Sequence, residues 1–595
     1  MGATEGGRRV VAVLTDVAAL SKPFDYLVPS NFSGPLEIGS RVRVPLHGRS
    51  VRGWIVGPGL EGLAEVKPIK SSLGVGPTEE ILDLARWASW RWNGPWARFL
   101  TAASSETIVR SLPQPPTFVP FDLPSSDLGL QGISGAESNE GMSLEIGPAT
   151  DPFDAVLGFI GRTLGSVHPE QRSVVVLVPG RGYARRLVGR LARRGIPAVD
   201  AGEDWAAARA GWPVVVGTRA GAFAPVQHLG GMIVLDGDDE RFYSESSPTW
   251  NVVDVARQRC QGLVPLLVVA SCPSAVITHH IEPRSLSRVQ VAAGWPQVEF
   301  VDLRQQDPRT GILSEKLVAL GRAALSDRPT GVALACIVNR KGRARLVVCS
   351  RCDNVARCAS CDAACALDVT LDCPRCGSSR PVICTTCGAT AMKLLRLGTT
   401  QLAADCAALF GEEAVEITAS SVPNAQGQAR IVVGTEAILH RVRSAGVVAF
   451  LDLDHHLLAP RAGAEQAALS LLGKAGRLVG GRAETEHGVV LVQTRLRDHL
   501  VLHAAVNGDP TAVLESDTAM RRQLGLAPFG AVAHLKGDGA QAFAEALVKS
   551  GLTISVLGKG EVLVQASDTA ILCDALSKVP RPKEKLRVGV DPASF

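Results

Sequence analysis

Four Cys-x-x-Cys pairs lie between residues 349 and 387, and they constrain the fold of this 595-residue chain more than any other feature. The pairs are Cys349/Cys352, Cys358/Cys361, Cys373/Cys376 and Cys384/Cys387. Each pair can place two thiolates on one tetrahedral ion, so eight thiolates suit two Cys₄ zinc sites. Nine of the fourteen cysteines fall in this stretch, and no secretion signal precedes it, which favours metal ligands over disulfides. We predict two Zn²⁺ ions per chain.

The spacing between the pairs predicts how they share the two ions. Five residues separate Cys352 from Cys358, which is short for a hairpin, whereas eleven separate Cys361 from Cys373, which suits a zinc ribbon. The predicted ligands are Cys349, Cys352, Cys384 and Cys387 for zinc 1, and Cys358, Cys361, Cys373 and Cys376 for zinc 2. Cys365 falls outside this spacing and is expected to be a small apolar residue. Sites with four protein ligands leave no open position for catalysis, so the module is expected to hold shape and present a surface.

Continuous Val/Leu/Ile runs alternate with helical patterns on both sides of the cysteines. They include "SVVVLVPG", "WPVVVGTRAGAF" and "GMIVLDGDDE" before the cluster, and "ARIVVGTEAIL", "GVVAFLDLD" and "HGVVLVQT" after it. Such runs are typical of buried strands in open parallel sheets. We therefore predict an α/β multidomain protein with two α/β lobes and a Cys-rich insertion in the second. Short Val-rich segments at 10–70, punctuated by Gly and Pro, predict a small N-terminal β-barrel, and the tail from about 505 predicts a mixed α/β C-terminal domain.

Composition and charge exclude several classes. No apolar run reaches the ~18 residues that a membrane span needs, and the N-terminus has no long apolar segment behind its charges. We expect a cytoplasmic chain that makes no membrane contact. A net charge of +4 excludes a histone-like polycation but permits a local basic surface.

A predicted helix that begins at Thr78 carries Trp87, Trp90, Trp92 and Trp96 among several arginines. Aromatic side chains interleaved with Arg can stack on nucleic-acid bases. Amphipathic spacing with Trp is more often packing against a neighbouring element, and we favour that interpretation.

Several stretches resemble the primosomal protein N′ (PriA) family of replication-restart helicases. "NRKGRARLVVCSRCDNVARCASCD" and "CPRCGSSRPVICTTCG" resemble its Cys-rich insertion, "KPFDYLVP" and "GSRVRVPLHGR" its N-terminal domain, and "VVVLVPGRG" and "MIVLDGDDE" its first helicase lobe. "VVAFLDLD" and "LLGKAGR" resemble its second lobe, and "RRQLGLAPF" its C-terminal domain. The resemblance implies two RecA-like lobes and covers nearly the whole chain.

The resemblance also implies a division of the chain. The expected domains are a 3′-DNA-binding domain (1–111), a linker (112–142), lobe 1 (143–290), lobe 2 in two parts (291–345 and 391–504), the two-zinc module (346–390) and a C-terminal domain (505–595). The family places a winged-helix domain before lobe 1. This chain offers only a Pro-, Ser- and Gly-rich stretch there, so we expect that domain to be missing.

The chain departs from the family where a motor handles ATP. A phosphate-binding loop needs a Lys and a Gly-rich turn, but the matching stretch reads "EIGPATDPFDAVLG" and no Lys occurs between Lys70 and Lys316. The family's D-E-E-H is Asp236-Gly237-Asp238-Asp239 here, which removes the water-handling Glu. Lys474 occupies one Arg position of the family's last motif, and Arg477 is retained. We expect no catalytic residue and no ATP cofactor.

The expected function is a replication-restart protein that binds forked or branched DNA and helps to assemble the primosome without ATP hydrolysis. The alternatives are an active ATP-dependent 3′-to-5′ helicase and a zinc-bearing scaffold that binds only proteins. The resemblance implies as partners the nascent-strand 3′ end, single-stranded-DNA-binding protein and the proteins that load the replicative helicase, with nucleoid association during restart.

By the same resemblance, Phe24, Asp25 and Tyr26 would form the pocket for the terminal nucleotide of the nascent strand, with Gly48 and Lys67 nearby. An aromatic ring can stack on the last base, and a carboxylate can accept a hydrogen bond from the 3′-hydroxyl. Without the resemblance, Phe24 and Tyr26 would be assigned to the barrel core and Asp25 to a turn.

Overall fold

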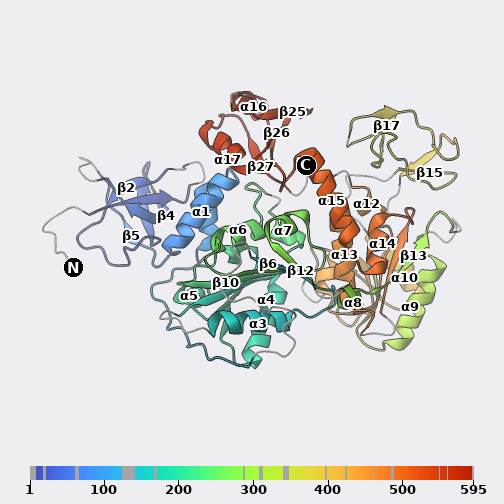
Figure 1. Ribbon diagram of the computed structural model, residues 1–595, viewed down its shortest axis with the longest axis horizontal. Coiled ribbons are helices and arrows are strands. Elements are labelled where there is room, and N and C mark those ends of the chain that lie inside the picture. Colours follow the sequence, from blue (N-terminus) through green and yellow to red (C-terminus); the bar gives the residue numbers. More distant parts are fainter. Residues whose placement is uncertain are drawn as a thin grey trace.

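The computed structural model describes residues 9–592 except 18–19, 21, 61–65, 123–140, 166–170, 245, 286–287, 307–311, 339–346, 375, 395–397, 423–424, 460, 484–487, 549 and 559, and the side chains of 282–289. The N-terminal sheet lies at one end of the elongated molecule, the two lobes follow, and the Cys-rich module and C-terminal domain project from the same side (Figure 1). No described helix is long and apolar enough to cross a membrane.

The N-terminal sheet is antiparallel and curls toward closure. Its strands, in the order β2-β1-β4-β3-β5, are β1 (Val10–Thr15), β2 (Phe24–Leu27), β3 (Arg41–Leu46), β4 (Arg49–Pro58) and β5 (Ser71–Ser72). The segment 67–72 bonds β2 at one end, through Leu27, and β3 at the other, through Arg43. It thereby connects the two sides of the sheet around a core of alternating apolar side chains, as a small barrel requires.

Two helices, α1 (Glu79–Arg91) and α2 (Trp96–Ala103), follow this sheet and pack on lobe 1. The next described residues, 112–122, contain no helix or strand, and the remainder of the expected linker up to 140 lies outside the described residues.

Lobe 1 is a seven-stranded sheet in which every pair of neighbours is parallel. In sheet order its strands are β12 (Glu282–Ser285), β6 (Met142–Glu145), β11 (Leu266–Ala270), β10 (Leu229–Leu235), β7 (Ser173–Leu177), β9 (Val214–Gly217) and β8 (Ala198–Asp200). Helices cover both faces, which explains why β7, β9, β10 and β11 are apolar on both sides. The helices are α3 (Phe153–Leu164), α4 (Arg181–Arg193), α5 (Trp205–Ala210), α6 (Val252–Cys260), α7 (Ala275–His280) and α8 (Arg288–Ala293).

Lobe 2 repeats this plan with six parallel strands. In sheet order they are β13 (Gln297–Asp302), β23 (Val489–Thr494), β22 (Ala445–Phe450), β14 (Val332–Ile337), β21 (Ile431–Gly434) and β20 (Ala414–Ile417). Its helices are α9 (Glu315–Asp327), α10 (Thr399–Phe410), α11 (Ile438–Arg441), α12 (Asp454–Leu457), α13 (Ala464–Val479) and α14 (Leu500–Asn507).

The Cys-rich module is inserted between β14 and α10 and has its own small core. Its short strands are β15 (Val347–Cys349), β16 (Ala366–Leu367), β17 (Leu371–Asp372), β18 (Ser379–Arg380) and β19 (Met392–Leu394).

The C-terminal region begins with α15 (Thr511–Leu524) and continues into an antiparallel sheet of order β25-β26-β24-β27. Its other elements are β24 (Ala531–Lys536), α16 (Ala540–Val548), β25 (Thr553–Gly558), β26 (Glu561–Ala566), α17 (Thr569–Lys578) and β27 (Arg587–Val590). It packs on α1, because Trp90 donates to Asp574 at 2.8 Å and Arg91 pairs with Asp591 at 2.7 Å.

Candidate functional sites

Each of the four Cys-x-x-Cys pairs forms a turn with the same backbone hydrogen bonds. In the first, the N–H of Cys349 donates to the carbonyl of Asn354 at 2.9 Å, and the N–H of Asp353 donates back to Cys349 at 3.0 Å; the turns that begin at Cys358, Cys373 and Cys384 repeat both bonds. The residue after each second cysteine has a positive φ, and it is Asp or Gly in every case: Asp353, Asp362, Gly377 and Gly388. Asp and Gly tolerate that backbone region better than most residues, so Cys-x-x-Cys-Asp/Gly encodes this turn locally.

These turns bring the eight thiols into two groups of four, with the membership that the spacing predicts. The sulfur–sulfur distances are 3.6 Å for Cys349–Cys387 and Cys352–Cys384, 3.5 Å for Cys358–Cys376 and 3.4 Å for Cys361–Cys373. These distances exceed a disulfide bond of about 2.05 Å. Four sulfurs placed tetrahedrally at ~2.3 Å from a zinc ion would lie about 3.8 Å apart. The donor set therefore fits two tetrahedral metal ions.

The turns act differently on their thiols, because burial raises the pKa of Cys352 and that of Cys361 to about 12, whereas the pKa of Cys358 is lowered. Backbone N–H groups of Ser360 and Cys361 lower the pKa of Cys358 to about 6, and the Ser360 N–H lies 3.4 Å from its Sγ. A deprotonated thiol is the form that binds metal. Cys365 is 3% exposed and packs in the small core of the module, as expected for an apolar role.

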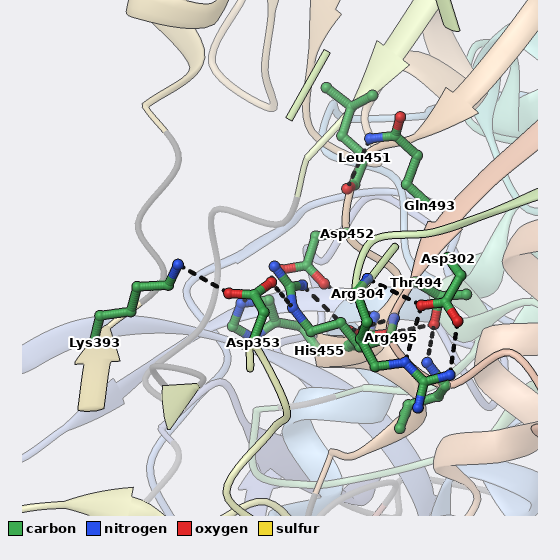
Figure 2. Close-up of polar contacts among 12 residues, drawn as sticks. Asp302, Arg304, Asp353, Lys393, Leu451, Asp452, His455, Gln493, Thr494 and Arg495 are labelled. Atoms are coloured by element: carbon green, nitrogen blue, oxygen red, sulfur yellow. Dashed lines mark hydrogen bonds and ion pairs between the residues drawn. The ribbon is translucent and has the colours of Figure 1, made fainter. Parts of the chain in front are cut away.

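An ion-pair network joins the first cysteine turn to lobe 2 (Figure 2). Arg495, directly after β23, donates from Nε to Asp353 Oδ2 at 2.9 Å, and Lys393 Nζ lies 2.9 Å from the other oxygen of Asp353. The backbone N–H of Arg495 donates to the fully buried carboxylate of Asp454, as does the hydroxyl of Thr494. A small apolar cluster of Val348, Val355, Ala364 and Leu458 lies at the same junction. The module is thus fixed to the carboxyl end of the lobe 2 sheet.

The first carboxylate of the acidic stretch at the end of β10 is closed off from solvent. Asp236, which is 7% exposed, accepts two hydrogen bonds at 2.5 Å from the guanidinium of Arg477 on α13 of lobe 2. The same guanidinium donates from Nε to the carbonyl of Pro148 at 2.9 Å. Arg477 therefore connects the β10 end, the β6–α3 loop and lobe 2.

The neighbouring carboxylates have partners as well. Asp239 receives a bidentate bond from Arg241 at 2.8 and 2.9 Å, and Lys474 Nζ lies 3.3 Å from it. Burial alone would raise the pKa of Asp239, but these two cations hold it well below its usual range. Asp238 accepts a bond from Ser470 at 3.0 Å, and burial, followed by the charge of Asp236, raises its pKa to about 6.

The β6–α3 loop is where the family resemblance would place a phosphate-binding loop. Three of its backbone donors are already in use: the N–H of Ala149 bonds to Gly294 at 2.9 Å, that of Thr150 to Gly147 at 3.0 Å, and that of Phe153 to the Asp151 side chain at 3.1 Å. Backbone N–H groups that point at the ligand are what cradle a phosphate. A small cavity between the lobes is lined by Asp236, Asp238, Asp239, Ser271, Cys272, Ser470, Gly473, Lys474 and Arg477. A larger cavity of about 140 Å³ is also lined by Asp238, Ser470 and Lys474.

Gly237, at the position of the water-handling Glu, has no room for a side chain. A Cβ there would lie 2.4 Å from Cγ1 of Val268 and 3.4 Å from Cδ1 of Ile277. The glycine is thus part of the packing between β10, β11 and α7, and a glutamate there would have to displace the Val268 side chain.

The residues predicted to hold a DNA 3′ end lie on and beside β2. Tyr26 is 3% exposed and donates to the carbonyl of Pro45 at 3.1 Å, so it belongs to the barrel core, whereas Phe24 is 36% exposed at the start of the strand. Asp25 accepts a bond from the Leu60 N–H at 3.2 Å. Because neighbouring residues of a strand alternate between faces, Asp25 does not share a face with Phe24 and Tyr26.

Lys67 lies beside β2, because its carbonyl accepts a bond from the Leu27 N–H at 3.0 Å, and its side chain is exposed. Gly48 lies with His47 in the two-residue turn between β3 and β4, and both have positive φ, as a tight hairpin turn requires. The structure therefore brings four of the five residues to one strand and its neighbour, and places Gly48 at a hairpin tip.

The single tryptophan-bearing helix predicted from Thr78 is in fact two, because α1 ends at Arg91 and α2 begins at Trp96 after Pro95, and the four tryptophans occupy two kinds of position. Trp92 is 1% exposed and packs edge-on against Trp87 at 5.3 Å, and Trp96 donates to the carbonyl of Leu82 at 3.3 Å, so packing accounts for these two. Trp87 and Trp90 are only half-buried and line a cavity.

Sequence reasoning missed three contacts: Arg495 with Asp353, Arg477 with Asp236, and Trp90 with Asp574. Each joins residues more than a hundred positions apart, so no local pattern reports it. The one available signal was the pair of carboxylates in "LDLD", because polar side chains at the carboxyl end of a parallel strand commonly face a site or an interface.

Comparisons with known proteins place these features in context. A family model for a 3'DNA-binding domain (3'BD) matches residues 11–105. The Probable replication restart protein PriA of Mycobacterium tuberculosis is 28% identical over 578 residues, covering 88% of this chain and 86% of the relative. The Replication restart protein PriA of Haemophilus influenzae is 27% identical over 404 residues, covering 62% of this chain and 54% of the relative. Among solved structures, S. cerevisiae Dbp5 bound to RNA and ADP BeF3 covers 64% of this chain and 83% of its own at 11% identity, with a TM-score of only 0.35.

Proposed function

This chain belongs to the PriA family of replication restart proteins, and on that premise we propose that it binds forked DNA at stalled replication forks and helps to assemble the primosome without hydrolysing ATP. The contact between Arg477 and Asp236 is the observation that most supports the absence of ATP hydrolysis. The carboxylate that would hold Mg²⁺ in a motor is neutralised by the protein's own guanidinium.

Three further features support the absence of ATP turnover. The β6–α3 loop has no Lys, and its N–H groups at Ala149 and Thr150 are satisfied within the protein. Gly237 offers no carboxylate to orient a water molecule. Phosphoryl transfer depends almost wholly on positioning and on stabilising developing charge, and these are the parts that supply both.

Steady-state ATP hydrolysis by the purified chain, with saturating forked DNA, tests this proposal against the alternative of an active 3′-to-5′ helicase. We expect no turnover above background. A rate that follows the protein through purification and is lost in Asp236→Ala would show that the chain hydrolyses ATP and would refute the proposal. Gly237→Glu provides a further check. It restores a carboxylate at this position but places its side chain against Val268, so we expect a destabilised protein without ATPase activity.

For DNA binding, we propose that the terminal nucleotide of a nascent strand contacts Phe24, Asp25 and Lys67, with Tyr26 and Gly48 shaping the site. The exposed ring of Phe24 can stack on a base, and Lys67 can approach a phosphate. Forks that end in a 3′-hydroxyl should bind more tightly than forks that end in a 3′-phosphate, and Asp25→Asn should reduce that preference. Equal affinity of the two forks for the unaltered chain would exclude a 3′-end site.

We further propose that both Cys₄ groups hold zinc, which would cross-link the Cys-rich module and keep its junction with lobe 2 in place. Zinc supplies no catalysis there, because all four positions of each site are filled by thiolates. The module and the C-terminal domain would then present surfaces to single-stranded-DNA-binding protein and to the loaders of the replicative helicase. The domain division given above, including the absence of a winged helix, is part of this proposal.

A further inference from the structure

A cavity of about 520 Å³ lies where three distant parts of the chain meet. Trp87 and Trp90 contribute from α1, residues 257–266 contribute from the end of α6 and the turn after it, and Ala527–Gly530 with Ser567–Ala570 contribute from the C-terminal region. Figure 1 shows α1, α6 and α17 converging at this point. Its volume falls within the range that small-molecule sites occupy, and such sites commonly occur where domains meet.

Two half-buried indole rings form the aromatic part of the wall. Trp87 is held by the edge-on contact with buried Trp92, and Trp90 by the hydrogen bond from its Nε1 to Asp574. Both rings are therefore fixed before any ligand arrives. Rigid aromatic side chains at such a position are suited to stacking on flat ligands.

The charges of the wall cancel. Arg91 lies 2.7 Å from Asp591 and 3.7 Å from Asp254, and Arg257 lies 4.0 Å from the other oxygen of Asp254. Asp568 uses its carboxylate to cap α17. A cavity with paired cations has no excess positive charge for a phosphate, so it favours a neutral ligand.

The wall nevertheless has hydrogen-bonding capacity. Gln258, Gln261 and Thr569 line the cavity. Arg91 also lines the cavity, and its side chain is only 9% exposed. Its Nη1 is buried without a hydrogen-bond partner among the described residues. A buried donor without a partner is costly, and a ligand with acceptor atoms would remove that cost.

We propose that this cavity binds an unstacked nucleobase of single-stranded DNA, between the rings of Trp87 and Trp90 and the polar groups of the α6 end. A nucleobase is flat, neutral and edged with donors and acceptors, as the wall requires. Its location supports this occupant, because α1 lies inside the stretch 11–105 that matches a 3'DNA-binding domain. The inference rests on the proposed DNA binding and adds a second contact, for the unpaired strand rather than for the 3′ end.

Intrinsic tryptophan fluorescence of the full chain with oligo-dT, which has no duplex and no fork, provides the direct test. We expect quenching by oligo-dT and binding weaker by roughly 5- to 100-fold for a strand whose sugars lack bases, since stacking on one base contributes on that scale. Trp87→Leu should bind oligo-dT as weakly as the unaltered chain binds the baseless strand. The two proteins should bind the baseless strand with equal affinity. Trp96→Leu, on the neighbouring helix and outside the cavity, should bind oligo-dT normally.

Two further variants separate stacking from folding. Asp574→Ala removes the hydrogen bond to Trp90 but keeps its ring, so it should weaken oligo-dT binding less than Trp90→Leu does. Trp87→Phe keeps an aromatic ring and should retain most of the binding, and Gln261→Glu, on the exposed rim, should weaken it without loss of stability. Equal binding of oligo-dT and the baseless strand by the unaltered chain, or normal oligo-dT binding by a folded Trp87→Leu, would overturn the inference. The preference for a 3′-hydroxyl over a 3′-phosphate, measured on forks with the same variants, reports separately on the 3′-end site.

Discussion

Arg477→Ala should destabilise the protein more than an ordinary loss of an ion pair. The substitution removes two hydrogen bonds to Asp236 and one to Pro148. The carboxylate of Asp236, whose side chain is only 10% exposed, then lacks its guanidinium partner. Loss of one partner from a buried pair costs about 3–5 kcal/mol, and from an exposed pair 0–1 kcal/mol. Because Arg477 is itself 32% exposed, we expect about 3 kcal/mol. For a cooperative unit the size of one lobe, this corresponds to a fall in Tm of roughly 6–12 °C.

Thermal unfolding of Arg477→Ala, Asp236→Ala and the double variant measures the interaction itself. We expect a coupling free energy of about 2 kcal/mol between the two residues. Arg185→Ala provides the matched control, because Arg185 also lies 2.5 Å from a carboxylate, that of Glu203, but with side chains 65% and 54% exposed. A structural role for the pair would be refuted if Tm falls no more in Arg477→Ala than in Arg185→Ala, or if the coupling free energy is below about 0.5 kcal/mol.

Magnesium and ATP complete this test. A ligand present at a hundred times its Kd stabilises the native state by about 2.7 kcal/mol, which is within easy reach of the same measurement. We expect no rise in Tm for the unaltered chain or for Arg477→Ala. A rise in Arg477→Ala alone would show that the guanidinium blocks an otherwise competent nucleotide site.

Three further predictions concern lobe 2 and the Cys-rich module. Cys352→Ser should remove one zinc ion and leave the other, measured by elemental analysis, whereas loss of both ions would contradict the two separate groups of thiols. Arg495→Ala should make the module more sensitive to proteolysis than Arg351→Ala, an exposed neighbour outside the junction; equal cleavage rates would mean that the contact with Asp353 does not anchor it. Burial, followed by the charge of Asp454, raises the pKa of Asp452 to about 7, above an unfolded value of about 3.9. The stability that protonated Asp452 contributes is therefore complete below pH 4 and is lost as the pH rises through 7. Asp452→Asn should therefore gain in Tm relative to the unaltered chain between pH 5 and pH 8, and a constant difference would contradict the shift.

What the sequence predicted well was encoded locally. The cysteine turns follow from a five-residue motif, Cys-x-x-Cys-Asp/Gly, because both the thiols and the positive-φ residue lie within it. The parallel sheets follow from continuous apolar runs, since a strand covered on both faces needs no polar alternation.

What the sequence could not predict depends on the meeting of distant segments. Arg477 and Asp236 are separated by 241 positions, and Trp90 and Asp574 by 484. In and just after α1 the same residue type serves two purposes: Trp92 is core, while Trp87 and Trp90 line a cavity that exists only once the C-terminal region has docked. Periodicity could not separate them, because it places residues on a helix face without reporting what covers that face.

The charges of the interlobe cleft explain why its carboxylates are compatible with a closed arrangement. Three aspartates at the end of β10 would repel one another if buried alone, but Arg241, Lys474 and Arg477 supply three cations within hydrogen-bond or ion-pair distance. Lys474 and Arg477 are three positions apart on α13, so one helix face supplies two of them. The cluster is therefore neutral without any ion, and a nucleotide triphosphate with its magnesium would bring net negative charge to a site whose cations are already matched. In this chain the acidic end of β10 therefore joins the two lobes through the protein's own ion pairs.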